Sequence, residues 1–289
     1  MCQSAVCSIF IVCGCLNNFI ASFKFREKMN IHKGFSFILV YICQSCQKGG
    51  KQLFCKFVVS YTIMSITENL EKITRSLPKS VKLVAVSKTK PASDIEEAWR
   101  WGQRVFGENK VQEMVGKYEA LPKDIEWHMI GHLQTNKVKY IVPFVKLIHG
   151  VDSGELLAKI DKEAGKVGRV VDCLLQFHIA EEETKFGLSE EEADVLLQSA
   201  AYREMRNIRV IGVMGMATFT DDQEQIHKEF RHLKEIFDRL KRHYFSEQAY
   251  FKELSMGMSE DYRIAVEEGS TMVRIGSSIF GARNYHIES

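Results

Sequence analysis

Short apolar runs alternate with amphipathic stretches along most of the chain, from residue 81 onward. The runs are rich in β-branched residues and have the length of single strands, at 81–87, 104–106, 126–130, 145–151, 169–179, 208–217, 250–256 and 271–276. Between them, apolar residues recur at the three- and four-residue spacing of a helix, for instance at 93–101, 153–165, 189–201, 222–243 and 259–268. Alternating strands and helices of this length indicate parallel strands joined by right-handed crossovers.

Eight such units in about 200 residues predict an α/β fold in which the strands close into a (β/α)8 TIM barrel. The alternative is a doubly wound open sheet, which normally carries a glycine-rich phosphate loop after its first strand. In this chain the first strand is followed instead by Ser87-Lys-Thr-Lys-Pro91. The barrel is therefore favoured, and its chemistry is expected where strands end and the following loops begin.

The first 63 residues differ in composition from the rest of the chain. They hold seven of the eight cysteines and seven of the 39 Lys and Arg, but only one of the 37 Asp and Glu. Two stretches that differ this much in charge and cysteine content are not expected to share a core. We therefore predict an extension over residues 1–63 and a barrel domain over residues 64–289, in which a capping box of Ser65 and Glu68 opens a helix.

The extension has several open interpretations. Its apolar run from Ala5 to Leu16 is shorter than the roughly 20 residues of a membrane helix, and no basic residue precedes it as in a secretory signal. The scarcity of acids would suit a mitochondrial presequence, but Arg is nearly absent. A zinc site would need a second close pair of ligands beside Cys43, Cys46, Cys55 and His32. We favour a poorly ordered or untranslated stretch and a cytoplasmic protein, with the mitochondrion as the alternative location.

Lys88 stands directly after the first predicted strand. Strand alternation places it on the same face as Val84 and Val86, and the opposite face carries Ala85 and Ser87. If the valine face lines the barrel, Lys88 ends a hydrophobic tube, where desolvation favours a neutral amine that can condense with an aldehyde. From this strand alone, a lysine that reaches solvent is the simpler interpretation.

Lys90 is a second candidate, but Pro91 places it in a turn, where we expect solvent around it. The motifs around the predicted strand ends favour Lys88 instead. Five of them occur in order: Leu83-Val-Ala-Val-Ser-Lys-Thr-Lys-Pro91, Phe106-Gly-Glu-Asn109, Glu126-Trp-His-Met-Ile-Gly131, Leu254-Ser-Met-Gly-Met-Ser259 and Gly269-Ser-Thr-Met-Val-Arg-Ile-Gly-Ser-Ser-Ile-Phe-Gly-Ala-Arg283. With these motifs the chain, from about Met64 to Arg283, resembles the pyridoxal phosphate homeostasis protein family, whose fold is similar to the barrel domain of alanine racemase.

The resemblance implies that Lys88 holds pyridoxal 5′-phosphate as a Schiff base. It places Gly276 and Ser277 at the phosphate, because the loop after the last strand of a TIM barrel often binds anions, with Ser255 as a further hydroxyl donor. Arg274 would face the pyridine nitrogen, keep it unprotonated and weaken the ring as an electron sink. A turn glycine, helix-capping serines and an arginine paired with a loop carboxylate are the plainer alternatives.

Other polar residues carry smaller expectations. Asn109, after the second strand, would hydrogen-bond the phenolic oxygen of the cofactor or lie beside its ring. Bacterial relatives have threonine where this chain has Ser277. The family has asparagine where this chain has His178, which we expect to fill the place of the asparagine; the alternative is a histidine that reaches the open face of the site. No metal site is expected. Packing roles are predicted for His128 and His149. Cys173 is expected to be an inert thiol in the core.

Two functions of different classes follow from the resemblance. An amino-acid racemase needs a second acid or base opposite the lysine, which alanine racemase takes from an extra β-domain. The chain ends at Ser289, so we expect no such domain and favour a protein that holds the cofactor for intracellular vitamin B6 homeostasis. A racemase or related enzyme is the alternative, and a scaffold that binds through the charged helix 222–243 is the third interpretation.

The expected partners follow from the same reasoning. The net charge of +2 gives no indication of nucleic acid or of an anionic membrane. Besides pyridoxal 5′-phosphate, we expect apo-enzymes that require it as partners. Nothing in the sequence resembles the dimer element of the racemase, so we expect a monomer.

Overall fold

The computed structural model of the chain describes residues 65–181 and 186–281, and the backbone of short strands before residue 64. It divides into two units, Met1–Asn69 and Leu70–Ser289. The division falls within α1 (Ile66–Ser76), slightly beyond the predicted boundary at residue 64. At the start of α1 the predicted capping box is present, since the Glu68 N–H donates to Ser65 Oγ (3.2 Å) and the Ser65 N–H to Glu68 Oε2 (2.7 Å).

The described residues of the first unit include five strands, for which the backbone alone is described. Three of them form an antiparallel sheet in the order β1-β5-β2, and β3 pairs with β4. The expectations of poor order, of a presequence and of a zinc site concern side chains or segments outside the described residues, and they stay predictions. The strands are β1 (Ala5–Ile11), β2 (Phe37–Cys43), β3 (Gln47–Lys48), β4 (Lys51–Gln52) and β5 (Cys55–Ile63).

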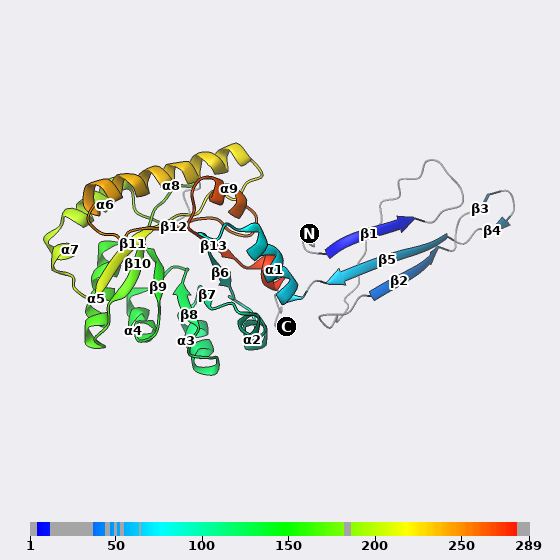
Figure 1. Cartoon of the computed structure of the whole chain (residues 1–289), viewed down its shortest axis with the longest axis horizontal. Helices are drawn as coiled ribbons and strands as arrows, with labels where there is room; N and C mark the ends of the chain where they lie inside the picture. Colours follow the sequence, from blue (N-terminus) through cyan, green and yellow to red (C-terminus); the bar gives the residue numbers. More distant parts are fainter. Residues whose placement is uncertain are drawn as a thin grey trace. The chain divides into compact units, whose positions relative to one another are not determined.

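The second unit is a closed barrel of parallel strands, which confirms the predicted (β/α)8 fold (Figure 1). Around the barrel the strands follow the order β10-β11-β12-β13-β6-β7-β8-β9. Each predicted apolar run coincides with one of these strands, although β7 extends two residues beyond its run. They are β6 (Lys82–Val86), β7 (Val105–Glu108), β8 (Glu126–Met129), β9 (Leu147–Val151), β10 (Val171–Gln176), β11 (Ile208–Met214), β12 (Glu253–Ser255) and β13 (Met272–Ile275).

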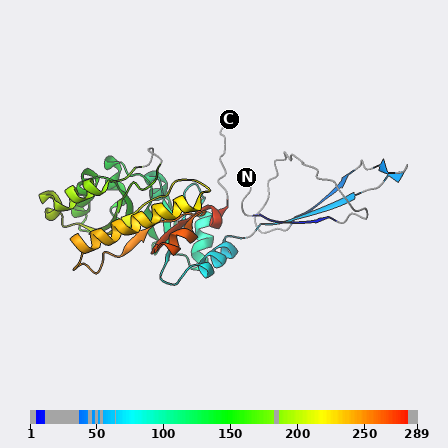
Figure 2. The same ribbon diagram turned by 90° about the horizontal axis from the view of Figure 1, so that it is seen from above.

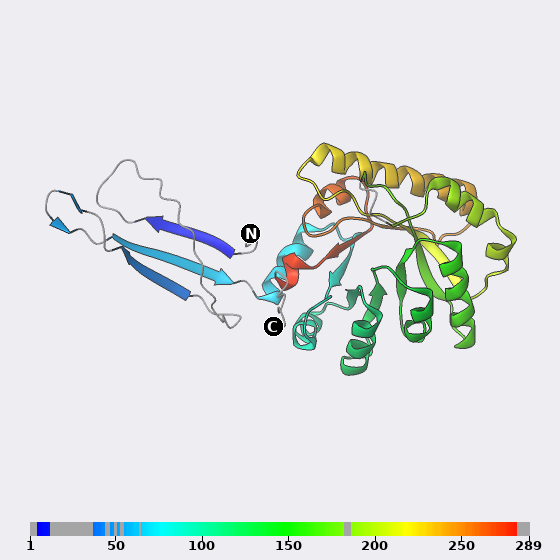
Figure 3. The ribbon, with the colours of Figure 1, turned by 180° about the vertical axis from the view of Figure 1, so that it is seen from behind.

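Helices lie outside the strands, and those between β6 and β10 stand side by side (Figure 3). The predicted helix 189–201 is interrupted, because Ser199 adopts an extended conformation (ψ 148°) and its side chain caps a new helix at Tyr202 N–H. The longest helix, α8, runs across one side of the barrel (Figure 2). The helices are α2 (Ala92–Trp101), α3 (Val111–Ala120), η1 (Thr135–Lys137), α4 (Val138–Ile141), α5 (Gly154–Lys166), α6 (Glu190–Gln198), α7 (Ala200–Glu204), α8 (Gln223–Tyr244), α9 (Tyr262–Glu267) and α10 (Ser277–Phe280).

Apolar side chains from many strands meet in one buried cluster. Val84 of β6 belongs to it, so the valine face of the first barrel strand points inward as the alternation predicted. A packed interior of this kind is usual for an eight-stranded barrel, whose centre is a core and not a pore. The other members are Leu147, Leu174, Ile211, Met214 and Met272, with Val105, Ile130 and Met216 packed against them.

Candidate functional site

The sequence candidates gather at the carboxyl ends of four consecutive strands of the barrel. β6 lies between β13 and β7, with Val84 opposite Arg274 and Val86 opposite Gly107. Because parallel strands keep this register to their ends, Lys88 follows β6 between the loop after β13 and the loop after β7. Ser255 ends β12, the next strand beyond β13.

Lys88 lies in a tight turn and is half-buried. The turn is closed by a hydrogen bond from the Lys90 N–H to the Ser87 carbonyl (3.0 Å). Within it, Thr89 has a φ of 64°, a left-handed conformation that is unfavourable for a β-branched residue. The backbone at Lys88 is therefore held in a specific and strained shape, which favours a directed side chain over one that simply reaches solvent.

Lys90 differs from its prediction. Its ammonium donates to the carbonyl oxygens of Phe280 (2.9 Å) and Gly281 (3.1 Å), and the residue is half-buried. The prediction that Lys90 is solvated in the turn was wrong, because a sequence pattern does not show that the end of α10 lies within its reach. Lys90 instead binds the last carbonyl groups of that short helix, which lack partners within the helix itself.

Arg274 is buried in the barrel, with 4% of its surface exposed. Its Nη1 donates to Ser255 Oγ (2.7 Å) and its Nη2 to the carbonyl oxygen of Gly215 (3.0 Å). Burial lowers the pKa of the guanidinium to about 10, so it stays charged at neutral pH. Among the described residues no carboxylate pairs with it within salt-bridge distance, which disfavours the alternative of a loop ion pair.

Two histidines extend this hydrogen-bonded chain across the barrel interior. Ser255 Oγ lies 3.0 Å from His149 Nδ1, and His149 Nε2 lies 3.0 Å from His128 Nδ1. A guanidinium can only donate, so Ser255 accepts from Arg274, and we assign the hydroxyl proton to His149 Nδ1 as its acceptor. His149 then carries its own proton on Nε2 and donates it to His128, so every bond of the chain points away from Arg274.

Both histidines are uncharged at neutral pH. Burial, with the charges of Lys82 and Lys146 as smaller causes, lowers the pKa of His128 to about 3. Burial is also the main cause that lowers the pKa of His149, followed by His128 and the Arg274 charge. The packing role predicted for these histidines is therefore accompanied by a hydrogen-bonding role that the sequence did not reveal.

Gly276 and Ser277 lie where β13 passes into α10, with Gly276 at the N-cap and Ser277 exposed in the first turn. A Cβ atom on Gly276 would lie 3.1 Å from the Val86 carbonyl oxygen, so glycine allows the loop to approach β6 closely. The Gly276 N–H donates to Ser259 Oγ (3.3 Å). The first N–H groups of a helix have no partner within it, which makes this end suitable for an anion.

Ser255 lies deeper in the barrel than Ser259, and its predicted role at the phosphate stays a prediction. Its hydroxyl is fully buried between Arg274 and His149, and Ser259 is the serine bonded at the start of α10. Both serines belong to the motif Leu254-Ser-Met-Gly-Met-Ser259, but strand β12 ends at Ser255 and keeps that side chain in the interior. The second serine of the motif was the signal that sequence reasoning missed.

Asn109 follows β7 directly and is half-buried. A Cβ atom on Gly131 would lie 2.8 Å from the Asn109 carbonyl oxygen, so the chain after β8 crosses this residue at close range. At the end of β10, Gln176 Nε2 donates to the Phe186 carbonyl (2.6 Å), whereas His178 is exposed. Asn109 thus lies beside the predicted site, next to the strand that carries Lys88.

Cys173 is buried in β10, and burial raises the pKa of its thiol, as expected for an inert core cysteine.

Comparisons with known proteins identify relatives of the barrel domain. A family model described as the N-terminal domain of alanine racemase matches residues 62–284. A pyridoxal phosphate homeostasis protein of Aquifex aeolicus is 40% identical over 233 residues, which cover 77% of this chain and 100% of that protein. Another, from Haemophilus influenzae, is 35% identical and covers 77% of this chain and 98% of its own length.

The chain belongs to the pyridoxal phosphate homeostasis protein family.

Among solved structures, this pyridoxal phosphate homeostasis family member is similar to PipY of Synechococcus elongatus. PipY without and with PLP bound is 35% identical, with TM-scores of 0.71 and 0.68, and each structure covers 75% of this chain and 100% of PipY. An alanine racemase of Clostridium difficile, 14% identical, has a TM-score of 0.64 and covers 75% of this chain and 60% of the racemase. The racemase therefore shares the barrel fold.

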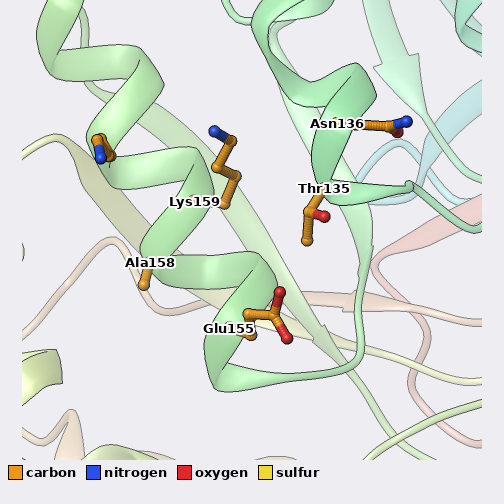
Figure 4. A pocket seen from close by; sticks show the side chains of 6 residues that line it. Thr135, Asn136, Glu155, Ala158 and Lys159 are labelled. Atoms are coloured by element: carbon orange, nitrogen blue, oxygen red, sulfur yellow. The ribbon is translucent and has the colours of Figure 1, made fainter.

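One open hollow of this family member lies beside the helices that follow β8 and β9. It is on the outer face, between η1 and α5, and Figure 4 shows its lining by Thr135, Asn136, Glu155, Ala158 and Lys159. Its residues come from helices and not from the loops around Lys88, so it is separate from the candidate site. In the described part of the chain no helix is long and apolar enough to cross a membrane, and no cluster of His, Cys, Asp and Glu side chains could hold a metal.

Proposed function

We propose that this protein binds pyridoxal 5′-phosphate at the carboxyl ends of β13, β6 and β7 and holds it as a Schiff base on Lys88, in the service of vitamin B6 homeostasis. The observation that carries the proposal is the position of Lys88. It lies half-buried on a strained turn, between the start of α10 and the end of β7. The PLP-bound structure of PipY, 35% identical, supports the same ligand here.

The residues present fit the cofactor. Gly276 brings the first N–H groups of α10 close to β6, and these groups with the Ser277 hydroxyl would bind the phosphate. Arg274 uses two of its five N–H donors on Ser255 and Gly215, so it retains donors for the ring nitrogen. Asn109 would bind the phenolic oxygen. When bound, the cofactor supplies an aldehyde for the lysine amine and a ring that can accept electrons.

We favour holding over catalysis because of Arg274. A guanidinium that is charged at neutral pH cannot accept a proton and would keep the ring nitrogen unprotonated, which weakens the ring as an electron sink. A PLP-dependent racemase remains the second candidate, since alanine racemase has the same barrel fold. Transfer of the cofactor to apo-enzymes, a monomeric state and a cytoplasmic location stay predictions.

Absorbance of the purified protein mixed with pyridoxal 5′-phosphate tests the proposal. Borohydride reduction followed by peptide mass spectrometry should place the adduct on Lys88, and Lys88→Ala should abolish both the absorbance band and the adduct. The matched control is Lys110→Ala, an exposed lysine after the next strand, which should retain both. A wild-type protein that forms no adduct, or an adduct on another lysine, would refute the proposal. Rapid solvent exchange of amino-acid α-protons would instead favour the racemase.

A further inference from the structure

A group of charges lies on the outer side of the turn that carries Lys88, in which a lysine and one glutamate are buried and a second glutamate is partly exposed. At its centre is Lys117 of α3, whose ammonium donates to the Ser87 carbonyl (2.8 Å), to Glu108 Oε1 (2.7 Å) and to Glu113 Oε1 (2.6 Å). These three bonds use all the donors of an ammonium group. Lys117, Glu108 and Glu113 together form the Lys117 cluster.

The Lys117 cluster binds the chain on both sides of Lys88. On one side, the Ser87 hydroxyl donates to Glu108 Oε1 (2.6 Å), in addition to the bond from Lys117 to the Ser87 carbonyl. On the other side, the Thr89 N–H donates to Glu113 Oε1 (2.6 Å). Each neighbour of Lys88 in the sequence is therefore tied to one glutamate, and both glutamates are tied to the same lysine.

The bond at Thr89 holds the strained part of the turn. Thr89 has a φ of 64°, which an L-residue with a branched side chain adopts only when its surroundings enforce it. Its side chain is exposed, so packing of that side chain does not account for the conformation. The hydrogen bond to Glu113 supplies the constraint. Loss of this bond would let the turn relax and change the direction in which Lys88 leaves the backbone.

The burial of Glu108 and Lys117 indicates that the cluster serves to fix the shape of the turn more than to stabilise the fold. Glu108 is fully buried, burial raises the pKa of its carboxyl, and the Lys117 side chain is 9% exposed. Ion pairs in such places contribute little net stability, because desolvation offsets most of their attraction, and apolar residues of the same size often serve the fold as well. What apolar residues cannot do is accept hydrogen bonds from Ser87 and Thr89.

We infer that Lys117, Glu108 and Glu113 are positioning residues that fix the direction of the Lys88 amine toward the aldehyde of its ligand. The inference rests on the proposed function, because it assumes that Lys88 reacts with pyridoxal 5′-phosphate. None of the three residues belongs to the predicted phosphate, ring-nitrogen or phenolic-oxygen contacts. Their loss should therefore weaken the covalent step and spare recognition of the rest of the molecule.

Two ligands that differ only at the reacting carbon separate these effects. Pyridoxal 5′-phosphate can react with Lys88, whereas pyridoxine 5′-phosphate has an alcohol in place of the aldehyde and binds without reaction. In Glu113→Ala, which removes the acceptor for Thr89, we expect affinity for the aldehyde to fall about tenfold, the effect of losing one charged hydrogen bond. Affinity for the alcohol should stay within about twofold. Glu113→Gln, which keeps an acceptor oxygen, should restore most of the loss.

The matched control is Glu163→Ala, which removes another glutamate bound to two lysines, Lys159 and Lys166, on a distant helix. It should change neither affinity. Equal affinity of wild type and Glu113→Ala for the aldehyde would overturn the inference, and so would a parallel loss for both ligands, which indicates general damage. If Glu113→Ala does not fold, Glu113→Met gives the same test, since a methionine of similar length fills the space but cannot accept the bond from the Thr89 N–H. A wild-type protein that forms no adduct on Lys88 would refute the proposed function itself. A wild-type protein that forms the adduct, together with unchanged affinity of Glu113→Ala for the aldehyde, would refute only the positioning role.

Discussion

The buried histidine pair should make the stability of the barrel depend on pH above the range where carboxylates titrate. His128 has a pKa lowered from 6.5 to about 3 by burial. Above pH 6.5 it is neutral in both the folded and the unfolded chain. As the pH falls from 6.5 toward 3, the unfolded chain takes up a proton that the folded chain refuses, so the folded state loses stability.

The size of the effect follows from the same shift. Each pH unit in this window costs about 1.4 kcal/mol for one histidine, so at pH 5 His128 alone should lower the free energy of unfolding by about 2 kcal/mol relative to neutral pH. The pKa of His149 is lowered in the same direction, and it adds to the loss. In His128→Asn the titrating ring is gone, while the amide oxygen can still accept the bond from His149.

Urea unfolding at pH 7 and pH 5 measures this difference. Tryptophan fluorescence is a suitable signal, because Trp127 is fully buried in β8. His128→Asn should be less stable than wild type at pH 7, owing to the smaller side chain, but should lose about 2 kcal/mol less on acidification. His243→Asn, on the exposed side of α8, should lose as much as wild type. Equal losses for wild type and His128→Asn would show that His128 is not held neutral in the folded state.

Two glycines in the barrel give further predictions. Gly212→Ala should lower the free energy of unfolding by more than about 3 kcal/mol in urea titration, since its Cβ would lie 1.7 Å from the Glu253 carbonyl oxygen and would force β11 from β12. Gly116→Ala, with open space around the new atom, is its control. Gly276→Ala should lower the affinity for pyridoxine 5′-phosphate, measured by calorimetry, about tenfold, because the loop must move away from Val86. Unchanged affinity would separate Gly276 from the phosphate site.

The barrel could be predicted from the sequence because each of its strands is buried on both faces. Strands of this kind appear as continuous apolar runs between helical segments, and the runs set the order of the units. The ends of the elements were less accessible. The run predicted for β7 stopped at Phe106, whereas the strand continues to Glu108. A buried glutamate breaks the apolar pattern, and the lysine that compensates it lies on the following helix.

The candidate site was partly predictable for a similar reason. Parallel strands in register bring their carboxyl ends together, so motifs far apart in sequence could be expected at one place, and Lys88 and Gly276 are indeed on neighbouring strand ends. The partners of individual polar atoms could not be expected. Ser255 and Ser259 stand in one motif, but the point where β12 ends decides which of them faces the interior and which meets α10.

Two polar systems flank the end of β6, and both break the rule that a barrel is apolar inside and between its layers. Inside, Arg274 begins a chain of hydrogen bonds through Ser255 to the histidines; outside, Lys117 joins the two glutamates. Such groups are costly to bury, and a barrel of this size could be stable without them. Departures from local rules are expected where a protein places function above stability. The outer system binds Ser87 and Thr89 on either side of Lys88 and so constrains the direction of Lys88, whereas the inner system holds the guanidinium of Arg274 in place.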